Sequence, residues 1–121
     1  TERVYRKVWE MAALSGFLTG REAAKVMIPR GKGTIIFTGA TASLRGSKGF
    51  SAFAGAKFAL RALAQSMARE LGPQGIHVAH PIIDGAIDTA FIRAFFALSQ
   101  ELRLESPNEF SIIQQIIVNA I

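Results

Sequence analysis

A short apolar strand that runs into a turn of small residues constrains the fold of this chain most. Residues 34–38 read TIIFT, which is apolar and β-branched without alternation, as in a strand covered on both faces. Residues 39–43, GATAS, form the turn, and an alanine-rich segment at 52–71 follows a loop at 39–49. Strand, turn and helix in this order predict an α/β fold with a parallel sheet.

Two long helices are predicted around this strand. Apolar residues recur mostly at steps of three and four over residues 2–28, and Pro29 with Gly31 is expected to end that helix. Ser51 is expected to cap the second helix, and Gly72-Pro73 to stop it. Each helix is long enough to cover one strand of a sheet.

A second strand is predicted over residues 76–83, which are again apolar. Pro81 lies inside this run and cannot donate a ladder hydrogen bond, so the strand is expected to end or bulge there. A helix is expected from Asp88 to about residue 104. For residues 110–121 a capping signal at 106–109 favours helix, whereas the isoleucine content favours strand, and both interpretations stay open.

The chain has 121 residues and is expected to form a single domain. Only two segments are predicted as strands, and both resemble central strands of a parallel sheet. A two-stranded parallel sheet is not expected to be stable alone. A missing N-terminal half, a partner chain or a rearranged fold would have to cover it, and a first residue other than methionine suggests a cut point at Thr1.

Composition excludes several classes of protein. There is no cysteine and no run of 18 apolar residues, so we expect neither disulfides nor a membrane-spanning helix, and a cytoplasmic protein. The net charge is +9 over residues 1–69 and −4 over residues 70–121. Because aromatic residues are not interleaved with the basic ones, we interpret this charge as solvated helix faces and expect no nucleic-acid partner. His77 and His80 are three apart on a strand and point to opposite faces, so no metal site is expected.

Phe53 and Lys57 are four residues apart on the second helix, and therefore lie on one face of it. Together with the strand and the small-residue turn before them, they resemble the short-chain dehydrogenase/reductase family, which carries Tyr-x-x-x-Lys at this place. The resemblance covers residues 1–92, and residues 93–121 diverge. It implies a doubly wound, Rossmann-like parallel sheet flanked by helices, whose N-terminal half is missing here. It also implies NAD or NADP as cofactor, and hydride transfer to or from a small-molecule carbonyl or alcohol.

Carried over from the family residue by residue, only the catalytic lysine is retained, as Lys57. The tyrosine position is Phe53, the serine position is Ala40, and the asparagine position falls on Ala13 or Ala12. The alternative for Lys57 is an ordinary surface lysine on an amphipathic helix. Loss of a positioned general acid costs about 10²–10⁴ in rate. The resemblance therefore implies an oxidoreductase with an impaired or inactive site. Three hydroxyls lie near enough to replace the serine only with a shifted loop: Thr38, Thr41 and Ser43.

The resemblance also implies a cofactor clamp after the second strand. Gly85, Ile87 and Thr89 match its pattern, while Asp84 stands where the family has proline. A plain Asp-Gly turn explains the same residues equally well. The glycine-rich phosphate loop is not found, since Gly31-Lys32-Gly33 precedes a strand rather than following one.

Two hypotheses about function follow. The chain is an NAD(P)-dependent oxidoreductase with an altered active site, or it is a non-catalytic module that associates through its helices. In the family the two long helices form the subunit interface, which implies a homo-oligomer. The second helix carries small residues that permit close packing: Ala54, Ala56, Ala59, Ala62, Ala64 and Ala68.

Overall fold

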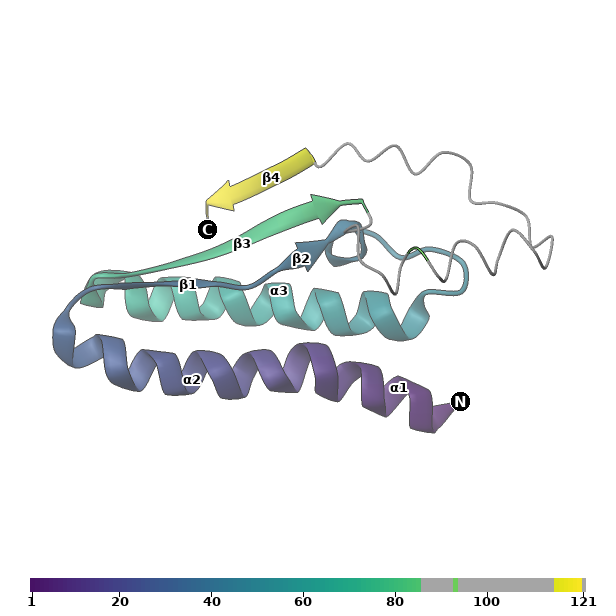
Figure 1. Ribbon diagram of the computed structural model, residues 1–121, viewed down its shortest axis with the longest axis horizontal. Coiled ribbons are helices and arrows are strands. Elements are labelled where there is room, and N and C mark those ends of the chain that lie inside the picture. Colours follow the sequence, from purple (N-terminus) through teal and green to yellow (C-terminus); the bar gives the residue numbers. More distant parts are fainter. Residues whose placement is uncertain (86–92, 94–114, 121) are drawn as a thin grey trace.

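The computed structural model describes residues 1–85, 93 and 115–120, the last of these as backbone only. Within these residues the chain forms one sheet and one layer of helices on one side of it (Figure 1). The elements are α1 (Glu2–Trp9), a π-helical stretch (Glu10–Leu14), α2 (Ser15–Met27), β1 (Gly33–Ile36), β2 (Gly39–Ala40), α3 (Ser51–Leu71), β3 (Ile76–Asp84) and β4 (Gln115–Ala120). The helix expected from Asp88 lies outside the described residues, apart from Arg93.

The first predicted helix is present as one continuous helical run. The Thr1 side chain accepts a hydrogen bond from the Val4 N–H and so caps its start. After Met27 one 3-10 turn follows, and Gly31 adopts the left-handed conformation with φ 63°, as the Pro29 and Gly31 signals indicate. The π-helical turn between α1 and α2 was not indicated by the sequence pattern, because an extra residue in one turn leaves apolar spacing almost unchanged.

The second predicted helix is confirmed as α3, which ends before Gly72. The expectation that Ser51 caps it is wrong. Phe50 occupies the cap position, no side chain bonds to the free N–H groups there, and Ser51 is the first helical residue. α3 is the longest described helix at 21 residues, and none of the helices in the described part meets the length and hydropathy needed to cross a membrane.

The sheet has four described strands rather than the two predicted, and one of them, β4, lies within residues 110–121, where helix and strand had both stayed open. β1 and β3 are parallel, with Gly33 opposite Ile76, and β2 and β3 are parallel, with Gly39 opposite Ile82. Both pairs have the same register, so β1 and β2 form one line along β3 that is interrupted at residues 37 and 38. β4 pairs antiparallel with the other edge of β3. β3 is therefore central, β1 is an edge strand, and part of the 39–49 segment expected as loop belongs to the sheet.

β3 continues through Pro81 to Asp84, so the expectation that the strand ends or bulges at the proline is wrong. The Ala79 carbonyl accepts a hydrogen bond from the Phe37 N–H at 2.9 Å, and residues two apart face the same neighbour. Pro81 therefore directs its missing donor toward the β1–β2 line, at the place where that line is interrupted. The other edge of β3 keeps its pairing with β4, since Pro81 there lies opposite Val118.

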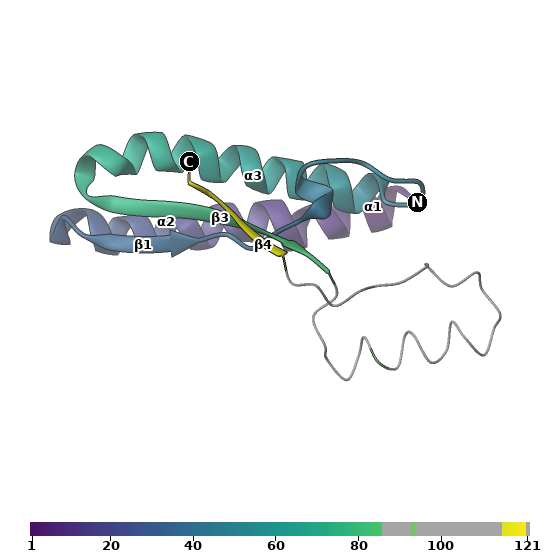
Figure 2. The ribbon, with the colours of Figure 1, turned by 90° about the horizontal axis from the view of Figure 1, so that it is seen from above.

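The core lies between the sheet and the two long helices, which lie side by side on one side of it (Figures 1 and 2). α2 approaches the Phe37 side chain closely at Gly20, where a Cβ atom would lie 2.8 Å from Phe37 Cζ. The buried cluster draws on both helices and on β1 and β3: Ala24, Ile35, Phe37, Leu60, Ala64, Leu71, Ile76 and Val78. The three parallel strands with helices against them confirm the predicted α/β, Rossmann-like class.

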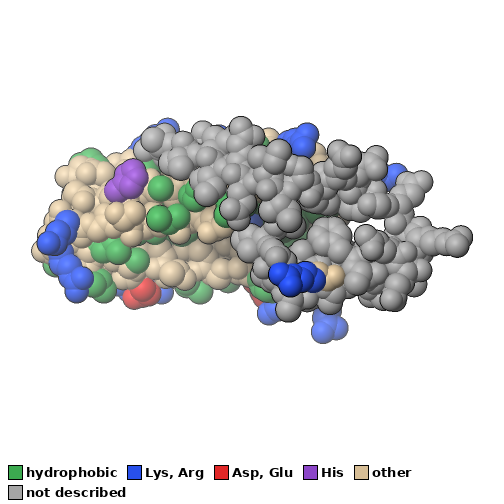
Figure 3. Space-filling view, turned by 45° about the horizontal axis from the view of Figure 1, so that its top comes forward, with side chains coloured by type: hydrophobic (Ala, Val, Ile, Leu, Met, Phe, Trp, Pro, Cys, Tyr) green, Lys and Arg blue, Asp and Glu red, His purple; other side chains and the backbone are tan. Residues whose placement is uncertain are grey.

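The face of the sheet away from the helices is open in the described part. Ile36 points to that face and is 63% exposed, while its neighbour Ile35 is buried against the helices. Figure 3, which turns the sheet side forward, shows hydrophobic side chains at the surface there. Helices of the described residues therefore pack against one face of the first strand only, and the predicted cover of its other face has to come from elsewhere.

Candidate functional site

The candidate site lies where β2 and β3 end and α3 begins. The carboxyl ends of parallel strands meet at this edge, which is where open α/β sheets bind ligands. A hollow of about 470 Å³ opens there, within the size range of small-molecule pockets. It is lined by Ala40, Thr41, Ala42, Arg45, Ser47, Phe50, Phe53, Ile83, Asp84 and Gly85.

Lys57 lies one helical turn beyond Phe53 and is bound to the strand line. Its Nζ donates a hydrogen bond to the Thr38 carbonyl at 2.9 Å and lies 5.7 Å from the centre of the Phe53 ring. The side chain is half-buried, and this burial lowers the pKa of the Lys57 ammonium. No carboxylate lies within ion-pair distance of it among the described residues. This is a fixed ammonium, which differs from the freely solvated lysine that was the alternative interpretation.

Phe53 presents an aromatic ring to the hollow but no ionisable group. It is 37% exposed and packs edge-to-face with Phe50, with ring centres 6.5 Å apart. A ring at this place keeps the packing that aromatic pairs provide. It has no proton to give or take, so Phe53 contributes shape without acid–base chemistry.

Two of the three hydroxyl groups near Ala40, those of Thr41 and Ser43, are already engaged. The Ala40 N–H donates to Ser43 Oγ at 3.1 Å, and Ser43 is fully buried outside the lining of the hollow. Thr41 lines the hollow, and its hydroxyl donates to the Asp84 carboxylate. Ser43 therefore stabilises the turn after β2, whereas Thr41 and Asp84 form a polar pair on the wall.

The Thr41–Asp84 pair joins residues 43 positions apart, and motif reasoning treated Asp84 as part of a turn. The register of the sheet is the signal that would have found it. Gly39 lies opposite Ile82, so the same offset brings Thr41 beside Asp84. Pairing of the two strands had to be known before the contact was visible.

His80 is a further residue that sequence reasoning did not place in the site. As expected, it faces away from His77, which is exposed, while His80 is 1% exposed and faces the helices. Its Nε2 has no hydrogen-bond partner among the described residues. Burial lowers the pKa of His80, and the positive charges of Arg61 and Lys57 lower it further. No cluster of three metal-ligating side chains occurs in the part of the chain that the structure describes.

Gly39 gives His80 its space. A Cβ atom at Gly39 would lie 2.4 Å from His80 Cε1 and 2.8 Å from Ile82 Cδ1, closer than real contacts. The absence of a side chain there lets the β1–β2 line approach the imidazole. Gly39 is therefore required by close packing at this point rather than by a left-handed turn.

Some of the described residues offer the polar groups that one end of a nicotinamide nucleotide needs, and others that it needs are not found among them. Lys57 carries three N–H donors and uses one on Thr38, which leaves two for ribose hydroxyls. Gly85 lines the hollow just after β3, while Ile87 and Thr89 lie outside the described residues. No glycine-rich turn joins a strand to a helix N-terminus in residues 1–85, so the described part offers no cradle for the pyrophosphate.

Ala13, the position matched to the family's asparagine, is buried in the π-helical turn between α1 and α2. Ala12 is only partly buried in the same turn. A methyl group at either place offers no donor or acceptor for a proton relay. An irregular helical turn at this position, against α3, is the kind of feature that often marks functional sites.

Comparison with known proteins agrees with this architecture. The chain is 38% identical over 74 residues to a short chain aldehyde dehydrogenase from Euphorbia lathyris, covering 61% of this chain and 26% of that protein. It is 60% identical to a short-chain dehydrogenase structure from Rhodopseudomonas palustris, with a TM-score of 0.68, covering 83% of this chain and 45% of the other. A 4-hydroxyisoleucine dehydrogenase mutant in complex with NADH and succinate is 27% identical, with a TM-score of 0.72, covering 85% and 42%.

The chain thus spans less than half the length of these proteins. The family profile described as short chain dehydrogenase matches residues 1–98, slightly beyond the boundary of 92 expected from the motifs. Members of this family bind NAD or NADP. With that match over most of its length, the chain belongs to the short-chain dehydrogenase/reductase family.

Proposed function

We propose that this chain forms the substrate side of an NAD(P)-dependent oxidoreductase site for carbonyl or alcohol substrates, and that its hydride-transfer chemistry is impaired. In this proposal Lys57 binds the ribose of NADP or NAD. Gly85, Ile87 and Thr89 lie against the nicotinamide. Residues 1–121 act as one domain in the cytoplasm, and the lack of cysteine fits a reducing compartment.

The observation that carries the proposal is the pairing of a fixed ammonium with a ring that cannot ionise. Lys57 Nζ lies 5.7 Å from the Phe53 ring and is held by Thr38. In the family a tyrosine at the Phe53 position exchanges a proton with the substrate, and a serine at the Ala40 position holds the substrate oxygen. The tyrosine and the serine are both absent while the lysine remains. We therefore propose that cofactor binding is less impaired than turnover.

The test of binding is a fluorescence titration with NADPH and with NADH. Saturable binding supports the proposal. Failure of both nucleotides to bind to the folded chain contradicts it.

The test of chemistry restores the two missing groups with Phe53→Tyr and Ala40→Ser together. We expect carbonyl reductase activity to rise by about 10²–10⁴ over the starting chain, because each group supplies a proton or an oxygen contact in the transition state. The matched control is Phe58→Tyr, since Phe58 is an exposed phenylalanine of the same helix that does not line the hollow. No gain, or an equal gain in the control, contradicts a competent site.

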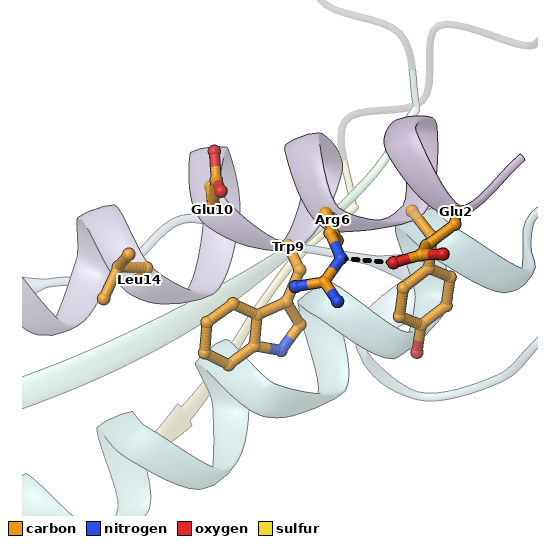
Figure 4. A pocket seen from close by; sticks show the side chains of 6 residues that line it. Glu2, Arg6, Trp9, Glu10 and Leu14 are labelled. Carbon is orange, nitrogen blue, oxygen red and sulfur yellow. Dashed lines mark hydrogen bonds and ion pairs between the residues drawn. The ribbon is translucent and has the colours of Figure 1, made fainter.

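A second candidate function, helix-mediated association of identical chains, is favoured by exposed apolar side chains on the first helical run. Trp9 is 41% exposed and Met11 is 68% exposed. Figure 4 shows Trp9 and Arg6 beside a hollow on α1, with Arg6 paired to Glu2 at 2.8 Å. Exposed apolar surface of this kind often marks an interface.

The oligomer proposal predicts a dimer or larger species in light scattering coupled to gel filtration. Met11→Glu is expected to dissociate it, because a carboxylate would be buried without a partner. Thr19→Glu, at another exposed position of the same helical run, is the control. A monomer at all concentrations contradicts this second candidate.

A further inference from the structure

The hollow beside Phe53 contains one charged group that nothing in the described part neutralises. Arg45 lines the hollow, and its guanidinium makes neither an ion pair nor a hydrogen bond with any described residue. The other charged group on the wall, Asp84, accepts a hydrogen bond from the Thr41 hydroxyl. The remaining lining is mostly apolar, from Ala40, Ala42, Phe50, Phe53 and Ile83.

The electrostatic field around the hollow is positive. Lys57 and Arg61 lie four residues apart on one face of α3, and both point toward the segment that leads from β1 to α3, where they donate to the carbonyls of Thr38 and Ser43. Both charges also lower the pKa of the buried His80 nearby. Like charges gathered beside a low-dielectric wall raise the local concentration of anions.

The acidic residues Glu2 and Glu10 of the first helical run, which packs against α3, do not cancel this field. Glu2 pairs with Arg6 at 2.8 Å, and Glu10 lies 3.7 Å from Lys7, within their own helix. Among the described residues this leaves Asp84 as the acidic group on the hollow itself. Arg45 therefore faces the hollow with its charge uncompensated.

From this arrangement we infer that the hollow takes a substrate with an apolar or aromatic body and a single anionic group, a carboxylate or a phosphate ester, and that Arg45 holds the anion. The apolar wall receives the body of the ligand. The planar guanidinium suits a two-point contact with carboxylate or phosphate oxygens. The Asp84 carboxylate repels a second anionic group placed on its side, which favours ligands with only one anionic group. This inference rests on the proposed function only in treating the hollow as the substrate site.

The test is a binding measurement by calorimetry with three aromatic probes: 2-naphthoate, neutral 2-naphthamide and 2-naphthyl phosphate. The chain is expected to bind 2-naphthoate or the phosphate at least about tenfold more tightly than the amide, since one charge-assisted contact is worth that much. Comparing the carboxylate with the phosphate identifies which anion the site prefers. Equal affinity for all three probes, or no binding of any, overturns the inference.

Arg45→Gln assigns the effect to one residue. We expect this variant to lose about tenfold in affinity for the preferred anion and to keep its affinity for 2-naphthamide. Lys48→Gln is the matched control, because Lys48 is a cation in the same loop that does not line the hollow. Equal losses in the two variants would mean that the general field binds the anion, and would overturn the role of Arg45. Circular dichroism verifies that both variants fold.

NADPH titration of Arg45→Gln separates this inference from the proposed function. Unchanged NADPH affinity with lost anion discrimination supports both. Anion discrimination in a chain that does not bind NADPH contradicts the proposed function and leaves the inference standing. NADPH binding without any anion preference overturns the inference alone.

Discussion

The two halves of α3 have different roles. From Leu60 onward the helix buries Leu60, Ala64 and Leu71 against the sheet, and these side chains form much of the core. Before Leu60 it presents Phe53 to the hollow at the ends of the strands, and it carries Lys57, which donates a hydrogen bond to the Thr38 carbonyl. The residues that depart from the family's catalytic pattern lie in this first half, on β2 and in the π-helical turn before α2, whereas the second half of α3 contributes to the core.

This difference shows that fold and chemistry depend on separate side chains. A phenylalanine in place of tyrosine loses one hydroxyl, yet its ring still packs against Phe50 at 6.5 Å. Neither Phe53 nor Ala40 belongs to the buried cluster. Selection for stability alone therefore does not preserve the catalytic groups, and the same scaffold tolerates their loss.

The largest effect on stability is expected from a substitution in the half of α3 that contributes to the core. Leu60→Ala is expected to lower the free energy of unfolding by about 2–5 kcal/mol, because it removes a buried side chain and leaves a cavity. Phe58→Ala, two residues earlier and exposed, should change it by less than about 1 kcal/mol. Urea unfolding followed by circular dichroism measures both. Equal effects would mean that the two sides of the helix do not differ as described.

A second variant acts at the boundary between core and site. Gly39→Ala places a methyl group 2.4 Å from His80 Cε1 and should cost about 1–3 kcal/mol of stability through overpacking. Gly46→Ala is the matched control in the loop that follows, since a Cβ atom there meets nothing within 4 Å and its backbone is not left-handed. Thermal unfolding compares the two. A control as damaging as the variant would refute the close-contact explanation.

Much of the fold was predictable because its signals are local. Apolar spacing located both long helices and both main strands, and Pro29, Gly31 and Gly72 located the helix ends. The predictions that were wrong concern features of the sheet that depend on how its strands pair. β2 and β4 form because β3 offers two edges, and Pro81 is accepted because its missing donor faces an interruption in the neighbouring line. No single segment of sequence contains that information.

The site was predictable only where a spacing motif existed. Phe53 and Lys57 follow from a four-residue interval on one helix, and their proximity is fixed by helical geometry. The Thr41–Asp84 contact and the burial of His80 beside Gly39 join residues about 40 positions apart. Such contacts depend on sheet register, which the spacing of apolar residues does not determine.

The pH dependence of stability tests whether His80, which lies beside the site, is buried in the folded chain. The pKa of buried His80 is lowered, so below its ordinary value near 6.5 the unfolded chain binds a proton that the folded chain resists. The free energy of unfolding should therefore fall as the pH decreases from about 7 to 5.5, and be fully restored above that range. Urea midpoints across this range measure the change.

His80→Leu removes the titrating group and should flatten this dependence. His77→Gln, on the exposed side of the same strand, should leave it unchanged. If His80→Leu keeps the full dependence of the unfolding free energy on pH, another group causes it. The His80 imidazole is then not the group whose protonation differs between the folded and unfolded chain.

The smallest effect on stability, and the sharpest test of the site half of α3, is expected from Lys57→Met. The half-buried ammonium donates one hydrogen bond to Thr38, so its loss should cost at most about 1 kcal/mol of unfolding free energy. NADPH affinity should fall about tenfold, because the ribose loses a charged donor. Lys32→Met, at an exposed position before the amino end of β1, is the control and should change neither quantity. If the two variants weaken NADPH binding equally, the nucleotide responds only to net charge, and the crevice between the strand ends and α3 is not where it binds.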